Sequence, residues 1–119
     1  MNLELRTQDF LRHMLQAILR IEIFSADLNE ASFLADIKTQ DAVIRNMEVI
    51  GEACRNILRL SPSFAQAHPE IPWGSAIGNR NALSHGYFSV DLNLIWATIR
   101  NDLPALKANL ERICKQDFA

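Results

Sequence analysis

Apolar residues recur at steps of three and four along most of the chain, which is the spacing of amphipathic helices that face a core. The first stripe contains Phe10, Met14, Ala17, Ile21 and Phe24, and it is widened by Leu11 and Ile18. The second lies in a predicted helix from about Asp36 to Leu60 and contains Val43, Met47, Ile50, Cys54 and Ile57. The third contains Leu92, Trp96, Ile99, Leu103, Leu106, Leu110 and Ile113. Three long segments are therefore expected to bury one face each.

Polar capping residues and prolines predict shorter helices between these segments. Residues 29–34 are expected to form a short helix or turn. Ser61 followed by Pro62 is typical of an N-cap and a first helical position, so a short helix is expected over 63–67.

A further helix is predicted from Trp73 to about His85. Pro72 is suited to its start, and Gly86 is suited to its end. This helix carries the most reactive side chains of the sequence.

The last segment is expected to begin after Asp91 as N-cap, and Pro104 should kink it or divide it near Asp102. The only run with strand character is 87–90, and it is isolated. We therefore predict an all-α fold, an up-and-down helical bundle.

Composition narrows the class of protein. At 119 residues, the chain has the length of one domain, here 1–119. Its 49% apolar and 22% charged residues exclude a disordered chain, and the formal net charge of -2 argues against a protein that coats nucleic acid through many phosphate contacts. The absence of a spanning apolar run or signal peptide favours a cytoplasmic protein, in which Cys54 and Cys114 are expected to be reduced, buried thiols.

A charged stripe is predicted on the side of the second helix opposite its apolar seam. It contains Arg45, Glu48, Glu52, Arg55 and Arg59. Such a stripe is usually a solvated face, and the alternatives are a subunit contact or a wall of an active site. Gly51 lies on the apolar side, where close approach by another helix would offset its cost of about 1 kcal/mol relative to alanine.

Segment 77–88 is where polar groups with useful chemistry crowd together. The imidazole of His85, with an ordinary pKa of about 6.5, suits proton transfer, and the guanidinium of Arg80 matches phosphate oxygens. Five residues of regular helix turn the chain by about 500°, so the two side chains would point about 140° apart. They converge only if the last turn loosens or a second copy of the motif lies across a dimer axis. Asn81 does share a face with His85.

Arg80, His85 and Tyr87, the sole tyrosine, match the RxxxxHxY motif of the HepT-like toxins in the HEPN ribonuclease superfamily, which the chain resembles. The resemblance extends to the segments 41–46, 50–53, 69–73, 90–92, 95–96 and 102–104. It covers most of the chain. A local departure is Asn79, where many relatives look more apolar.

The resemblance implies a small HEPN-like helical bundle that forms a two-fold homodimer and cuts RNA with no metal or cofactor, as the toxin of a type II-like toxin-antitoxin pair. It implies Arg80 and His85 as the catalytic pair, with Asn81 and Glu52 as supporting groups. Tyr87 would be the site at which a minimal nucleotidyltransferase antitoxin, MntA-like, adds AMP.

Two other readings of the sequence predict no catalysis. In one, the chain is a helical binding partner, or substrate-binding subunit, of a nucleotidyltransferase. In the other it is a purely structural helical dimer, and Arg80 and His85 tolerate alanine.

Overall fold

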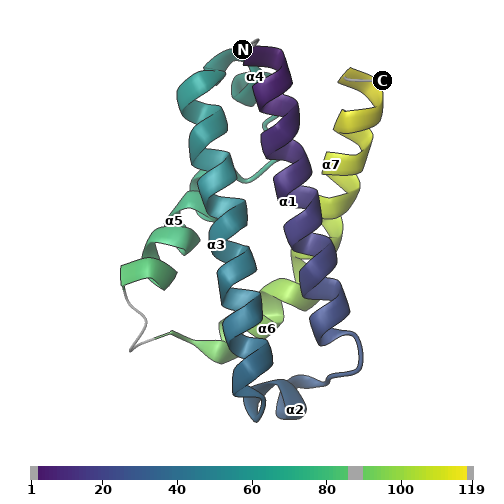
Figure 1. Cartoon of the computed structure of the whole chain (residues 1–119), viewed down its shortest axis with the longest axis vertical. Helices are drawn as coiled ribbons and strands as arrows, with labels where there is room; N and C mark the ends of the chain where they lie inside the picture. The colour runs from purple at the N-terminus through teal and green to yellow at the C-terminus, as the bar shows by residue number, and fades with distance from the viewer. Residues whose placement is uncertain (1–2, 86–89, 118–119) are drawn as a thin grey trace.

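The computed structural model describes residues 3–85 and 90–117, with side chains placed for 5–83 and 90–116. Within them the backbone forms seven helices: α1 (Leu3–Ser25), α2 (Glu30–Leu34), α3 (Ile37–Leu60), α4 (Pro62–Ala67), α5 (Trp73–His85), α6 (Leu92–Asn101) and α7 (Leu103–Asp117). Figure 1 shows α1, α3 and α7 side by side along the long axis, with α1 and α3 running in opposite directions. The predicted all-α bundle is confirmed.

The long helix α3 is the centre of the bundle. It packs against α1 on one side and α5 on the other, so α5 lies on the outer side of α3, away from α1 (Figure 1). Its predicted seam is confirmed, because Val43, Met47, Ile50, Cys54 and Ile57 are all buried. Cys54 is buried as expected, and burial raises the pKa of its thiol to about 12, which keeps this free cysteine protonated. The other free cysteine, Cys114, is only partly buried because it lies at the edge of the core.

The buried face of α1 differs from the prediction. Phe10 is only partly buried and Phe24 is 41% exposed, whereas Leu11 and Ile18 are fully buried. The residues that face the core are Thr7, Leu11, Met14, Ala17, Ile18, Ile21 and Ser25. The two polar residues at the ends of this set make internal hydrogen bonds, from Ser25 Oγ to the Ile21 carbonyl and between the Thr7 and Ser61 hydroxyls.

Several helices begin at polar caps. Asn29 and Ser32 form a reciprocal capping box at α2, and the side chains of Asp36 and Asp91 accept hydrogen bonds from backbone N–H groups at the start of α3 and α6. Ser61 precedes α4 as expected, but its side chain makes no capping bond. Its hydroxyl lies instead 2.6 Å from that of Thr7.

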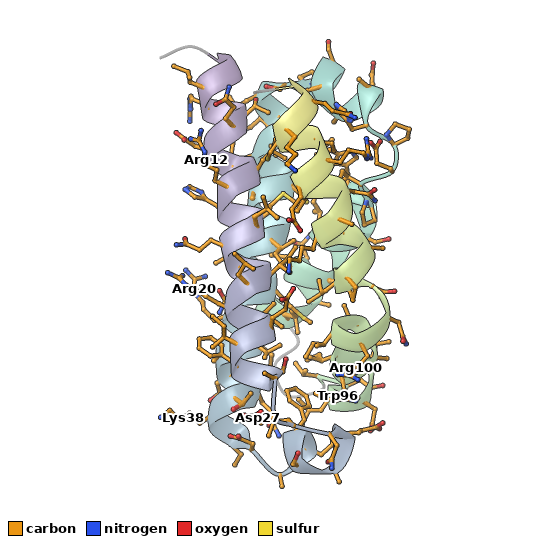
Figure 2. All side chains as sticks on the ribbon, turned by 90° about the vertical axis from the view of Figure 1, so that its right-hand side faces the viewer. Arg12, Arg20, Asp27, Lys38, Trp96 and Arg100 are labelled. Carbon is orange, nitrogen blue, oxygen red and sulfur yellow. The ribbon has the colours of Figure 1, made fainter. Side chains whose placement is uncertain are left out.

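The last segment is divided near Asp102, as predicted. Asp102 ends α6, and Pro104 occupies the second position of α7, where a missing N–H costs nothing. Trp96 of α6 packs on Phe33 with ring centroids 5.3 Å apart, and Arg100 covers its ring (Figure 2). Within residues 3–85 and 90–117, no helix has the length and apolarity needed to cross a membrane.

The connection between α4 and α5 is tied to α7 by a polar cluster. The carboxylate of Glu70 accepts a hydrogen bond from Arg112 Nη2 at 2.9 Å and lies 3.2 Å from Nδ1 of His68. Next to it, Trp73 is buried, and its indole N–H donates to the carbonyls of His68 and Ala65. These contacts fix the start of α5.

Glu70 should make folding stability depend on acid pH. Hydrogen bonds, first that from Arg112 and then those with the backbone and His68, lower the pKa of Glu70 from 4.5 to about 2. A folded-state pKa below the unfolded value gives a contribution that is present above pH 4.5 and is lost as the pH falls toward 2. Glu70→Gln should therefore lower the melting temperature near neutral pH and have less effect at about pH 3.

Thermal unfolding followed by circular dichroism measures the melting temperature at each pH. Glu111 is an exposed carboxylate on α7, so Glu111→Gln is the matched control and should leave the pH profile of the melting temperature unchanged. An identical acid dependence in wild type and Glu70→Gln would show that the cluster does not stabilise the fold.

Candidate active site

At Gly51 the helices α3 and α5 lie in close contact. A Cβ added to Gly51 would lie 2.6 Å from the carbonyl oxygen of Ala76 and 3.0 Å from Cγ of Arg80, and closer still to Cβ of Arg80. The predicted close approach of another helix at Gly51 is therefore confirmed. Because Gly51 has no side chain, Arg80 can pack directly against α3 at this position.

Arg80 lies against Glu52, the residue that follows Gly51. Its Nε is 3.4 Å from Oε2 of Glu52, and the Arg80 side chain is 26% exposed. That Oε2 is shielded from solvent and accepts no hydrogen bond from the described residues, so the nearby guanidinium charge compensates it. The two side chains hold each other in place at the junction of the helices.

Arg80 also reaches the next residue of its own helix. Its Nη1 donates to Oδ1 of Asn81 at 3.0 Å, and Asn81 is exposed. Within 5–83 and 90–116, no other side chain takes up the remaining guanidinium donors. A partly exposed cation with donors to spare is suited to a phosphate oxygen.

The charged stripe of α3 runs past this site. Glu52 is its member that contacts α5, and Glu48 is half-buried. Arg45, Arg55 and Arg59 are exposed. The arginines therefore form a solvated face, and Glu52 as part of an active-site wall stays a prediction.

The remaining motif residues lie at the limit of the described structure. His85 is the last residue of α5, and its side chain lies outside the described residues. Tyr87 lies outside them altogether. The structure thus brings together Arg80, Asn81 and Glu52, and whether His85 joins them stays a prediction.

Other histidines and possible metal ligands do not form a second centre. His13 is exposed on α1, and His68 belongs to the structural cluster with Glu70. Among the side chains that the structure describes, no three His, Cys, Asp or Glu residues gather as a metal site would require.

A pocket that sequence reasoning missed lies beside α5. It has a volume of about 400 Å³ and is lined by residues of α3, α5, α6 and α7. Asn79 is among them. The pattern of α5 gave no signal of it, because the lining comes from four helices.

Comparison with known proteins decides the family. The family model described as "Ribonuclease HepT-like" matches residues 14–113, which include Arg80 and His85. The chain belongs to the HepT-like ribonuclease family. The match spans α3 and α5 entirely, so the contact at Gly51 lies inside the family domain.

Relatives in other organisms cover nearly the whole HepT-like chain. A Thermococcus cleftensis protein named "Probable ribonuclease HepT" is 43% identical over 108 residues, 91% of this chain and 96% of the relative. "Putative RNase TTE0752" of Caldanaerobacter subterraneus is 31% identical over 91% of this chain and 94% of the relative. "Putative RNase MJ0127" of Methanocaldococcus jannaschii is 38% identical over 89% and 85%. No solved structure matches the chain.

Gly51→Ala should destabilise the HepT-like domain because the new methyl group meets backbone and Cβ atoms that cannot move alone. Overpacking of this kind costs about 1–3 kcal/mol. Gly78→Ala is the matched control, since a Cβ at Gly78 meets nothing within 4 Å. In α5 that change should stabilise the protein by up to about 1 kcal/mol through helix propensity.

Urea unfolding of the two variants and the wild type gives the free energies of unfolding. Opposite signs for the two substitutions support the close contact. If Gly51→Ala were as stable as Gly78→Ala, the helices would not meet at Gly51.

Proposed function

We propose that the chain is a metal-independent endoribonuclease, the toxin of a toxin-antitoxin pair. The observation that carries the proposal is the match to the HepT-like ribonuclease family over a region that includes the Arg80, His85 pair. The partly exposed guanidinium of Arg80, held by Glu52, is consistent with it.

The proposed reaction is an attack within the RNA strand. His85 takes the proton of a ribose 2′-OH, the 2′-oxygen forms a bond to the adjacent phosphorus, and the bond from phosphorus to the 5′-oxygen breaks. A second proton donor, His85 of another copy of the chain, protonates the leaving 5′-oxygen. The products are a 2′,3′-cyclic phosphate and a 5′-hydroxyl, so no metal or cofactor is required.

Arg80 supplies the electrostatic part of the reaction. Its remaining donors stabilise the negative charge that grows on the phosphoryl oxygens, a contribution that exists only if the cation is held in place beforehand. Glu52 and Asn81 are positioning residues, because they contact Arg80 at 3.4 and 3.0 Å.

A homodimer completes the proposed site by bringing two motifs together. Exposed apolar side chains on α1 and α3 support self-association. Leu19 is 45% exposed, and Ile23 and Ile37 are each 72% exposed. Light scattering tests the dimer, and a chain that stays monomeric while cleaving RNA would exclude a shared site.

Regulation is assigned to Tyr87. A neighbouring nucleotidyltransferase antitoxin, MntA-like, transfers AMP from ATP to the tyrosine hydroxyl with release of pyrophosphate. The added phosphate then competes for Arg80 with the RNA phosphate and blocks cleavage without a change of fold.

Cleavage of RNA by the isolated chain should persist in excess EDTA and depend on His85. His85→Ala should reduce the rate by about 10²-fold or more, the usual contribution of a general base. Arg80→Ala should reduce it by about 10²-fold through lost charge stabilisation. The same substitutions at His13 and Arg20 are matched controls, since both residues are exposed on α1 and Arg20 projects outward in Figure 2.

Gel analysis of a labelled RNA, with circular dichroism to check the fold, gives these rates. Activity that requires magnesium or survives His85→Ala would contradict the mechanism. An inactive wild type that still binds the nucleotidyltransferase would favour a non-catalytic partner instead.

Intact-mass spectrometry after incubation with the antitoxin and ATP should show added AMP on the wild type and none on Tyr87→Phe. Tyr87→Phe should also escape neutralisation, because it lacks the acceptor oxygen. If the antitoxin fully neutralises Tyr87→Phe and leaves no adduct on the wild type, control is by masking alone.

A further inference from the structure

The pocket between α5, α6 and α7 has the construction of a ligand site. Its floor is apolar and buried, formed by Met47, Ile50, Leu103 and Leu106. Its volume of about 400 Å³ falls within the range of pockets that hold small molecules. Sites of that kind combine an apolar floor with a few polar groups that fix orientation.

The rim of the pocket is polar and largely unoccupied by internal bonds. Ser75, Asn79, Asn101 and Asp102 line it and are exposed. Within the part of the chain that the structure describes, their side chains accept or donate no hydrogen bond and form no ion pair. Three amide or carboxylate groups are thus available to one ligand.

The charges at the rim select the ligand. None of the described lining residues is Lys, Arg or His, and the two charged ones are Glu70 and Asp102. Arg112 is engaged by two of the lining side chains, Glu70 and Asn109, and no cation among the described residues forms an ion pair with Asp102. A phosphate is therefore disfavoured, and a neutral ligand that presents N–H donors is favoured.

The pocket lies one residue away from the proposed catalytic cation. Ala76 and Asn79 of α5 contribute to its lining, and the next residue, Arg80, turns toward α3. A strand of RNA with a phosphate at Arg80 would have a base within reach of this side of α5. Single-stranded RNA is read by hydrogen bonds to the edges of such unstacked bases.

We propose that this pocket is a base-recognition subsite for RNA that accepts a nucleobase with an exocyclic amino group. The carboxylate of Asp102 accepts a hydrogen bond from the amino group, and the side-chain amides of Asn79 and Asn101 form hydrogen bonds with neighbouring atoms on the edge of the base. Uracil, which has no amino group, fits least well. The subsite rests on the proposed ribonuclease function, to which it adds a preference at one position of the substrate.

Methyl NMR of the full chain, labelled at Met, Ile and Leu, tests the subsite with free nucleosides. Adenosine and cytidine should shift the methyl signals of Met47, Ile50, Leu103 and Leu106 in a saturable way, and uridine should bind clearly more weakly. The core methyls of Ile18 should not move. Nucleosides carry no phosphate, so the result does not depend on Arg80 or on catalysis.

Asp102→Asn should weaken adenosine binding by about tenfold, because a charge-assisted hydrogen bond becomes a neutral one. Asparagine has nearly the same shape as aspartate, and Asp102 is exposed, so the helices on either side should still form. Asp27→Asn is the matched control, since Asp27 is exposed at the end of α1 and outside the pocket lining (Figure 2). It should leave binding unchanged.

Absence of nucleoside-induced shifts in the four pocket methyls would overturn the subsite, as would equal binding of uridine and adenosine. Shifts that follow protein concentration instead would show that a second copy covers the pocket. RNA cleavage without nucleoside binding would reject the subsite and leave the proposed function intact. Nucleoside binding by a chain that cleaves no RNA would support the pocket as a nucleoside site and reject the proposed ribonuclease function.

Discussion

The position of helix α5 depends on the fit of its backbone against Gly51 of α3. Side chains normally hold packed helices about 8–10 Å apart. Here the glycine admits the carbonyl of Ala76 and the Cβ of Arg80 at distances that no alanine would allow. Trp73 anchors the start of α5 through burial and two hydrogen bonds, so both the beginning and the middle of the helix are fixed.

That placement gives the two sides of α5 different roles. On one side, Arg80 meets the carboxylate of Glu52 and keeps donors for a ligand. On the other side, Asn79 faces a pocket with an apolar floor and a polar rim. The cation suited to phosphate, Arg80, thus directly follows a residue that lines a pocket suited to a neutral planar group. This arrangement agrees with the membership of the chain in a ribonuclease family.

Local sequence signals predicted much of the fold because the forces behind them act over a few residues. The seam of α3, the bounds of α5 and the division at Asp102 all follow from periodicity, caps and proline. The seam of α1 was misplaced at Phe10 and Phe24. Thr7 and Ser25 extend the true seam, and a count of apolar residues cannot recognise polar groups that find internal partners.

Contacts between distant residues lay beyond the reach of such signals. Glu70 and Arg112 are 42 residues apart, and nothing in either segment marks them as partners. The sequence did place Arg80, Asn81 and Glu52 among the site residues, but through family resemblance. Their geometry depends on how α5 docks on α3, which no single helix encodes.

The most direct test of the central claim uses an RNA oligonucleotide with one preferred cleavage position and a second oligonucleotide with a single 2′-deoxy sugar at that position. Products are analysed by mass spectrometry in the presence of EDTA. If the chain cleaves by attack of the 2′-OH, the first RNA yields a 2′,3′-cyclic phosphate and the second is not cut at that position. Cleavage of the 2′-deoxy RNA at the same position, or an upstream product that ends in a 3′-hydroxyl at the cut, would contradict the account.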